Sequence, residues 1–130
     1  YSGVIATFLE QARNGDDITV EGDGTQTRDF VHVSDVVQAN LAAARTDNVG
    51  EAFNVCTGTE TSVLELAETV QDAVDSDSDV VHVAARDGDI QRSYGDGTNA
   101  SEHLDFEPTI ELSDGLRDLA SDDKDVLKPA

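Results

Sequence analysis

One stretch decides the fold of this 130-residue chain: GDGTQTRDFVHVSDV, residues 22–36. Its two glycines flank an aspartate, a composition typical of a tight turn. The apolar run Phe30–Val33 follows and predicts a short strand. Ser34 is then predicted to cap a helix, with Asp35 placed favourably against the helix dipole. A turn, a strand and a helix start in so few residues indicate a mixed α/β protein.

The residues before this stretch fit the same class. Apolar side chains recur at helical spacing between Val4 and Ala12, and Gly15 is a stop signal for that helix. Ile18 and Val20 then alternate with polar residues, as in a half-buried strand.

The residues after it continue the alternation of strands and helices. Strands are predicted at 52–56 and 80–84. Between them, Ser62 and Glu65 match a capping box at the start of an amphipathic helix. A last helix is predicted through Leu116, Leu119 and Ala120. We therefore expect one α/β unit over residues 1–121 and a charged, frayed tail over residues 122–130.

Charge excludes several classes of partner. The chain has 28 acidic and 8 basic residues, a formal net charge of −20, so neither nucleic acid nor an anionic membrane is an expected partner.

Aspartate makes up 19 of the 28 acids, although it is a poor helix former. Molar salt would screen the repulsion between these carboxylates, so we expect a halophilic protein. An acidic interaction protein from a low-salt organism is the alternative.

Cysteine and histidine usage limits the chemistry further. A single cysteine, Cys56, excludes an internal disulfide, and the three histidines form no cluster with metal-ligand spacing. The apolar runs are far shorter than a membrane span, and the amino end does not read as a signal peptide, so we expect a cytoplasmic protein without a bound metal.

Two of the six arginines follow glycine-containing turns. Arg28 comes shortly after Gly22-Asp23-Gly24, and Arg86 opens the sequence Arg86-Asp87-Gly88-Asp89. A guanidinium group offers forked donors that fit phosphate oxygens, so both are candidate anion anchors. An ion pair with a neighbouring acid is an equally good interpretation of each.

Four motifs resemble, in the right order, a known enzyme family: residues 1–5, 22–36, 53–58 and 86–90. They are similar to the carboxy-terminal portion of NAD-dependent nucleotide-sugar epimerases and dehydratases, the extended short-chain dehydrogenases, and most of all to UDP-glucose 4-epimerases. The resemblance implies a substrate-binding part that is normally packed on a Rossmann domain absent from these residues.

The resemblance also implies site residues and partners. In the family pattern, Arg28 and Arg86 would hold the diphosphate of a UDP-linked sugar, and Asp89 would bind the ribose hydroxyls. The strand just before Gly22 would lie along the base with Thr19, Val20 and Glu21. NAD would be bound by the missing amino-terminal domain, and the full-length enzyme would be a homodimer.

The family's catalytic machinery is not found in this sequence. The glycine-rich NAD loop and the Tyr-x-x-x-Lys motif are missing, since neither Tyr1 nor Tyr94 is followed by a lysine four residues later. We therefore expect a fragment that is inactive alone and contributes no catalytic residue. A related nucleotide-sugar dehydratase, decarboxylase or reductase, and a non-catalytic binding module of the same fold, are the alternatives to an epimerase.

Three positions depart from the family pattern. Glu21 stands where an aromatic residue often stacks on the base, which leaves the preference for a pyrimidine open. Cys56 replaces a usual glycine and predicts altered packing there, and Asn99 replaces a usual lysine.

Overall fold

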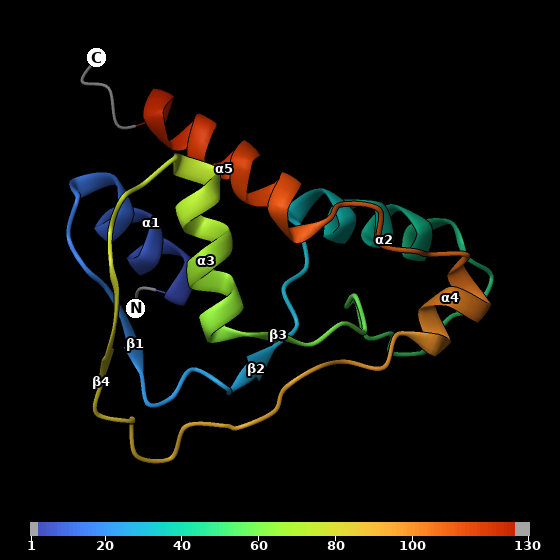
Figure 1. Ribbon diagram of the computed structural model, residues 1–130. Helices are drawn as coiled ribbons and strands as arrows, with labels where there is room; N and C mark the ends of the chain where they lie inside the picture. Colours follow the sequence, from blue (N-terminus) through green and yellow to red (C-terminus); the bar gives the residue numbers. More distant parts are fainter. Residues whose placement is uncertain (1–2, 127–130) are drawn as a thin grey trace.

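The computed structural model describes residues 3–126 and has a mixed α/β architecture (Figure 1). Its elements follow in the order α1 (Val4–Asn14), β1 (Ile18–Glu21), β2 (Thr27–Arg28), α2 (Val33–Arg45), β3 (Thr61–Ser62), α3 (Val63–Val74), β4 (Val80–Val83), α4 (Thr98–Leu104) and α5 (Leu112–Val126). The predicted α/β class is confirmed.

The main body is built on a parallel pair of strands. β1 and β4 pair in register from Ile18 opposite Val80 to Glu21 opposite Val83, and α1 and α3 pack together beside them. Ile18 and Val20 are fully buried, so Thr19 and Glu21 lie on the other face of β1. The strand predicted from alternating residues is confirmed.

One hydrophobic core holds this body together. Helix α5 lies along α3 and contributes Leu116 and Ala120 to the core. The remaining buried members come from α1, β1 and α3: Phe8, Leu9, Ala12, Ile18, Val20, Val63, Leu66, Ala67 and Val70. The three helices and the strand pair therefore bury the apolar stripes that the sequence predicts.

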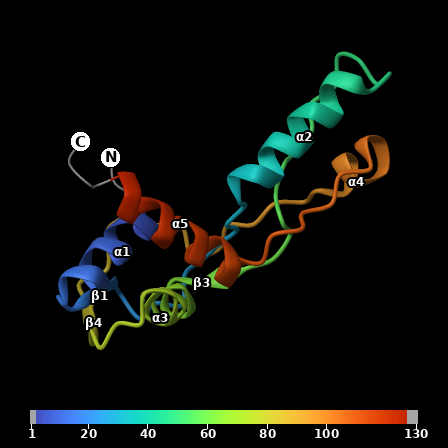
Figure 2. The same ribbon diagram turned by 90° about the horizontal axis from the view of Figure 1, so that it is seen from above.

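A second, smaller lobe consists of α2 and α4. Figure 2 shows both helices extending away from the main body. They enclose a separate cluster of Ala39, Ala100 and Phe106, against which Phe53 and Val55 pack.

Two strand predictions are wrong. Residues 30–32 and 52–56 form no strand, and Val33 already belongs to α2. Instead β2 and β3 pair antiparallel, with Thr27 opposite Ser62 and Arg28 opposite Thr61. An apolar segment becomes a strand only where another strand lies alongside, and among residues 3–126 none accompanies either segment.

The caps gave one confirmed and one wrong prediction. The Glu65 amide donates to Ser62 Oγ at 3.1 Å, which confirms Ser62 as the N-cap of α3. Helix α2, however, is capped by His32, whose Nδ1 accepts from the Ser34 amide at 3.0 Å. Ser34 therefore lies inside the helix that it was predicted to cap.

The carboxy-terminal helix is longer than the sequence predicts. α5 continues to Val126, beyond the expected start of the tail at residue 122, while residues 127–130 lie outside the described part. Within residues 3–126, no helix combines the length and the apolar character needed to cross a membrane.

Candidate functional site

A pocket of about 250 Å³ lies between α1, β1, β2 and the segment after β4. Five of the six predicted site residues line it: Thr19, Glu21, Arg28, Arg86 and Asp89. The sixth, Val20, lies in the same strand, but its side chain is buried in the core. The structure therefore brings the two arginine motifs together in one place.

The turn at residues 22–24 makes this convergence possible. Gly22 and Gly24 have φ values of +70° and +79°, in the left-handed region that other residues rarely adopt. A Cβ on Gly24 would lie only 3.0 Å from side-chain atoms of Val20 and Leu64. The Gly22 amide donates to the Val83 carbonyl at 2.9 Å, which keeps the end of β4 beside the turn. Arg86 and Asp89 therefore emerge next to β1.

Arg28 is held firmly by three acceptors. Its Nη2 donates to Asp89 Oδ1 at 2.6 Å, and its Nη1 donates to the carbonyls of Thr27 and Ile90, both at 2.6 Å. The Arg28 and Asp89 side chains are only 27% and 29% exposed. This guanidinium joins β2 to the segment after β4 and is oriented before any ligand arrives.

Arg86 is held more loosely. Its Nη2 lies 3.2 Å from Glu21 Oε1, and the two side chains are 66% and 38% exposed. The sequence left two roles open for these arginines, an anion anchor and an ion pair with a neighbouring acid. In the structure each guanidinium lies in the candidate anion pocket and is also paired with an acid.

Two glutamines fix the edge of β1 that faces the pocket. The Gln11 side chain donates to Thr19 Oγ1 at 2.9 Å and accepts from the Thr19 amide at 3.1 Å. Gln26, which is buried, donates to the Glu21 carbonyl at 2.9 Å. The free edge of the strand that is expected to lie along a base is therefore fixed at Thr19 and at Glu21.

Sequence reasoning missed the role of Asp29. Its carboxylate accepts from the amides of Thr57 at 3.1 Å, Gly58 at 2.8 Å and Gly95 at 3.2 Å, and from the Thr57 hydroxyl. Burial alone would raise the pKa of Asp29, but these hydrogen bonds outweigh it, and the pKa lies below its usual value. Only its position beside Arg28 in the motif could have drawn attention to it.

Arg92 and Glu60 were also missed. Arg92 Nε and Nη2 donate to the two carboxylate oxygens of Glu60 at 2.8 and 2.9 Å. Thr27 Oγ1 donates to the same carboxylate at 2.9 Å, and these bonds lower the pKa of Glu60. Arg92 also lies over the ring of Tyr94, 5.5 Å from its centre. Glu60 therefore connects Thr27 of β2 to Arg92, which lies in the segment between β4 and α4.

Cys56 packs against glycine backbone. A Cβ on Gly95 would lie 2.5 Å from Cys56 Sγ, so the thiol occupies space that only a glycine leaves open. Burial and the nearby Asp29 raise the pKa of the Cys56 thiol, which keeps it protonated. Cys56 therefore acts as a small packed side chain at this position.

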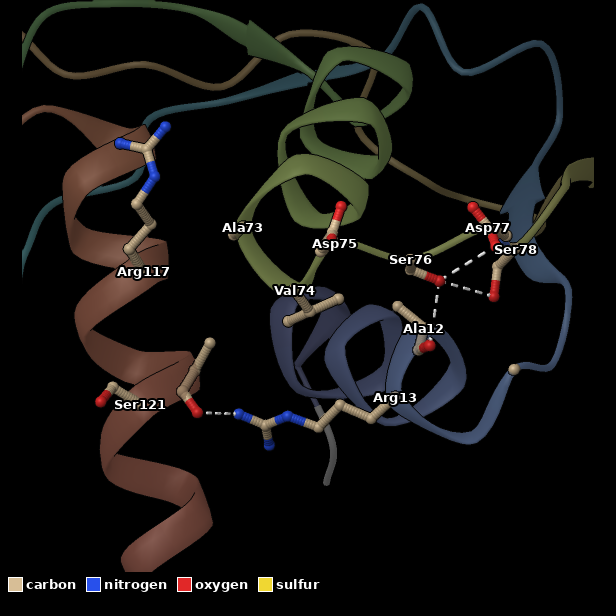
Figure 3. A pocket seen from close by; sticks show the side chains of 12 residues that line it. Ala12, Arg13, Ala73, Val74, Asp75, Ser76, Asp77, Ser78, Arg117 and Ser121 are labelled. Atoms are coloured by element: carbon tan, nitrogen blue, oxygen red, sulfur yellow. Dashed lines mark hydrogen bonds between the residues drawn. The ribbon is translucent and has the colours of Figure 1, made fainter.

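A larger cavity of about 590 Å³ lies elsewhere, between α1, α5 and the loop after α3 (Figure 3). Its polar groups join elements: Arg13 donates to the Ala120 carbonyl, and Ser76 Oγ donates to the Ala12 carbonyl at 3.0 Å. None of the predicted site residues lines it. Within the part of the chain that the structure describes, no three His, Cys, Asp or Glu side chains are grouped to hold a metal ion.

Comparison with known proteins identifies relatives of this chain. Residues 1–56 match the family model of the NAD dependent epimerase/dehydratase family. The chain is 39% identical to UDP-glucose 4-epimerase of Mycolicibacterium smegmatis over 115 residues, which cover 88% of this chain and 37% of that protein. It is 36% identical to UDP-N-acetyl-alpha-D-glucosaminuronate decarboxylase of Bacillus cytotoxicus over 124 residues, with coverages of 91% and 39%.

Solved structures share the fold. UDP-glucose 4-epimerase from Thermotoga maritima, solved with UDP-glucose, superimposes with a TM-score of 0.90 at 35% identity, over 98% of this chain and 41% of that one. UDP-glucuronic acid 4-epimerase from Bacillus cereus, solved with UDP-glucuronic acid and NAD, gives a TM-score of 0.87 at 26% identity, over 96% and 40%.

The chain thus spans about two fifths of the length of the relatives that it matches. The matches extend over almost all of the chain, and they include proteins solved with NAD. Residues 1–56 thus match the NAD dependent epimerase/dehydratase family, and almost the whole chain is similar to relatives that include an epimerase solved with NAD.

Proposed function

We propose that the pocket holding Arg28, Arg86 and Asp89 binds the nucleotide diphosphate of a nucleotide sugar, as the substrate-binding portion of an enzyme similar to UDP-glucose 4-epimerase. The observation that carries this proposal is the convergence of residues 61 positions apart, Arg28 and Asp89, in one pocket with a second arginine. In a chain of net charge −20, the two guanidinium groups of this pocket are donors that a diphosphate can use.

The chemistry of each group fits one part of the ligand. Guanidinium forks suit the oxygens of a diphosphate, and a carboxylate such as that of Asp89 accepts hydrogen bonds from a ribose diol. Thr19, Val20 and Glu21 present a fixed strand edge along which a base can lie. The assignment is supported by the relatives solved with UDP-sugars.

The pocket is smaller than the usual ligand site of about 300–1,000 Å³. We infer that residues 1–121 supply one wall of the substrate site and that the sugar is enclosed by another part of the enzyme. Such a divided site explains why the arginines in this chain would bind a diphosphate without acting on the sugar.

NAD supplies the chemistry in this family by taking a hydride from the substrate and returning one. The described residues do not fit this cofactor. The glycine turn after β1 leads into β2, not into a helix whose amino terminus could hold the dinucleotide phosphates. We therefore propose that NAD is bound outside this chain and that the 130 residues alone are inactive.

The binding site is tested by calorimetric titration of the protein at its natural length with UDP and with UDP-glucose. Arg28→Ala and Arg86→Ala each remove a charge-assisted contact, so we expect Kd to rise by about 10- to 100-fold. Arg45→Ala, at the exposed end of α2, is the matched control and should leave Kd unchanged. Equal affinity in all four proteins would refute the assignment.

A decarboxylase is the second candidate function. The observation in its favour is the 36% identity to the Bacillus cytotoxicus decarboxylase, close to the 39% for the epimerase. Both activities would use the same diphosphate site. Analysis of the products formed from UDP-glucose and from UDP-glucuronic acid separates them, because only decarboxylation releases carbon dioxide.

A further inference from the structure

We propose that Glu21 is an internal competitor for the substrate: its carboxylate holds Arg86 in the empty pocket and must release it before a diphosphate can bind. This inference rests on the proposed function. It makes Glu21 a residue that sets the affinity of the site, by opposing the anion that the arginines attract.

The two arginines of the pocket differ in how they are held. Arg28 donates to Asp89 and to two backbone carbonyls, and its side chain is three-quarters buried. Arg86 has one ion pair among the described residues, with Glu21, and two-thirds of its side chain is exposed. Arg86 is therefore the cation that can change partner at little cost, since exposed ion pairs contribute little to stability.

Glu21 cannot leave the pocket by a movement of its backbone. It is the last residue of β1, in register with Val83 of β4, and its carbonyl accepts from the buried Gln26. The next amide, of Gly22, is bonded to the Val83 carbonyl. Only rotation of the side chain can take the carboxylate away from Arg86, and the charge stays close to the pocket after that rotation.

The charges of the pocket balance in the empty state. Arg28 faces Asp89 and Arg86 faces Glu21, so two cations are matched by two anions. A diphosphate that binds here meets a neutral site instead of a doubly positive one. Removing the charge of Glu21 would leave one guanidinium without its internal partner, and the site would then attract an anion more strongly.

A different role for Glu21 predicts the opposite result. If its carboxylate accepted a hydrogen bond from the base, a neutral side chain would weaken the binding of UDP. It would not alter the binding of pyrophosphate, which has no base. The sign of the change therefore decides between competition and base recognition.

The test compares Glu21→Gln with the unaltered protein at its natural length, by titration with UDP and with inorganic pyrophosphate. We expect Glu21→Gln to bind both about three- to tenfold more tightly in low salt, and the gain to shrink in about 1 M salt as exposed charges are screened. Glu51→Gln, which also removes one exposed acid, is the control for net charge and should show little gain.

A double variant isolates the competition. In an Arg86→Gln background, Glu21 has no guanidinium to occupy, so Glu21→Gln should give a smaller gain than in the unaltered protein. Unchanged or weaker binding by Glu21→Gln, or an equal gain in Glu51→Gln, would overturn the inference while leaving the diphosphate site intact. Absence of binding in the unaltered protein would instead overturn the proposed function, and this inference with it.

Discussion

Asp29 adjoins Arg28 in the sequence, yet its hydrogen-bond donors lie 28 to 66 residues further along the chain. Its carboxylate accepts from the amides of Thr57, Gly58 and Gly95, and so holds these two loops next to the end of β2. A single half-buried acid thus organises loops that have little secondary structure of their own.

Asp29 makes stability depend on pH. Its pKa is lowered in the folded protein, so its contribution is complete above the ordinary value of 3.8 and is lost as pH falls through the folded pKa. We expect Asp29→Asn to lower the free energy of unfolding by about 1–3 kcal/mol at neutral pH, because it weakens several charge-assisted hydrogen bonds.

Urea denaturation measures this effect. The difference between Asp29→Asn and the unaltered protein should begin to narrow as pH drops below about 4 and should vanish once the Asp29 carboxylate of the folded protein is protonated. The control, Asp47→Asn, changes an exposed acid and should have no such effect. A difference that is the same at neutral and acid pH would contradict the role of the carboxylate charge.

At the scale of elements, Asp35 joins α2 to the segment before α5. It is only 2% exposed and accepts from the Thr109 amide at 3.1 Å, the Thr109 hydroxyl at 3.1 Å and the Ile110 amide at 3.1 Å. The sequence places it correctly in the first turn of α2, but as a residue that complements the dipole. The structure adds that it fixes the smaller lobe to the main body.

Asp35→Ala should therefore weaken the connection between the smaller lobe and the main body. The substitution leaves the amides of Thr109 and Ile110 without their carboxylate acceptor, so we expect a loss of about 1–3 kcal/mol in the free energy of unfolding. Faster hydrogen exchange at the amides of Thr109 and Ile110 would show that the loss is local to this connection. Asp47→Ala is the control, and equal stability of the two variants would disprove the structural role of Asp35.

The helices were predictable from the sequence because their signals are local. The stripe in α1, its end at Gly15 and the Ser62–Glu65 cap of α3 each need only neighbouring residues. The strands were less predictable from the sequence. The alternation in β1 was read correctly, but residues 52–56 carry the same apolar character without a paired strand. Pairing is decided by segments distant in the chain.

At the scale of the whole molecule, the net charge of −20 opposes compaction. We propose that the protein is adapted to high salt, because the Debye length falls from about 10 Å at 0.1 M to about 3 Å at 1 M and shields the acids from one another. Circular dichroism should then show helical structure in molar salt and its loss on dialysis into low salt. Folding that does not depend on salt would refute this proposal.

The sequence by itself determined the α/β class, the helices and the resemblance that named the site residues, since periodicity, caps and ordered motifs are properties of neighbouring residues. Only the tertiary structure decided how the site is assembled. Parallel pairing of β1 with β4 brings Arg86 beside Glu21, and the turn at Gly22 and Gly24 allows Asp89 to reach Arg28. Those contacts join residues more than 60 positions apart, and no local pattern encodes which acid each arginine will meet.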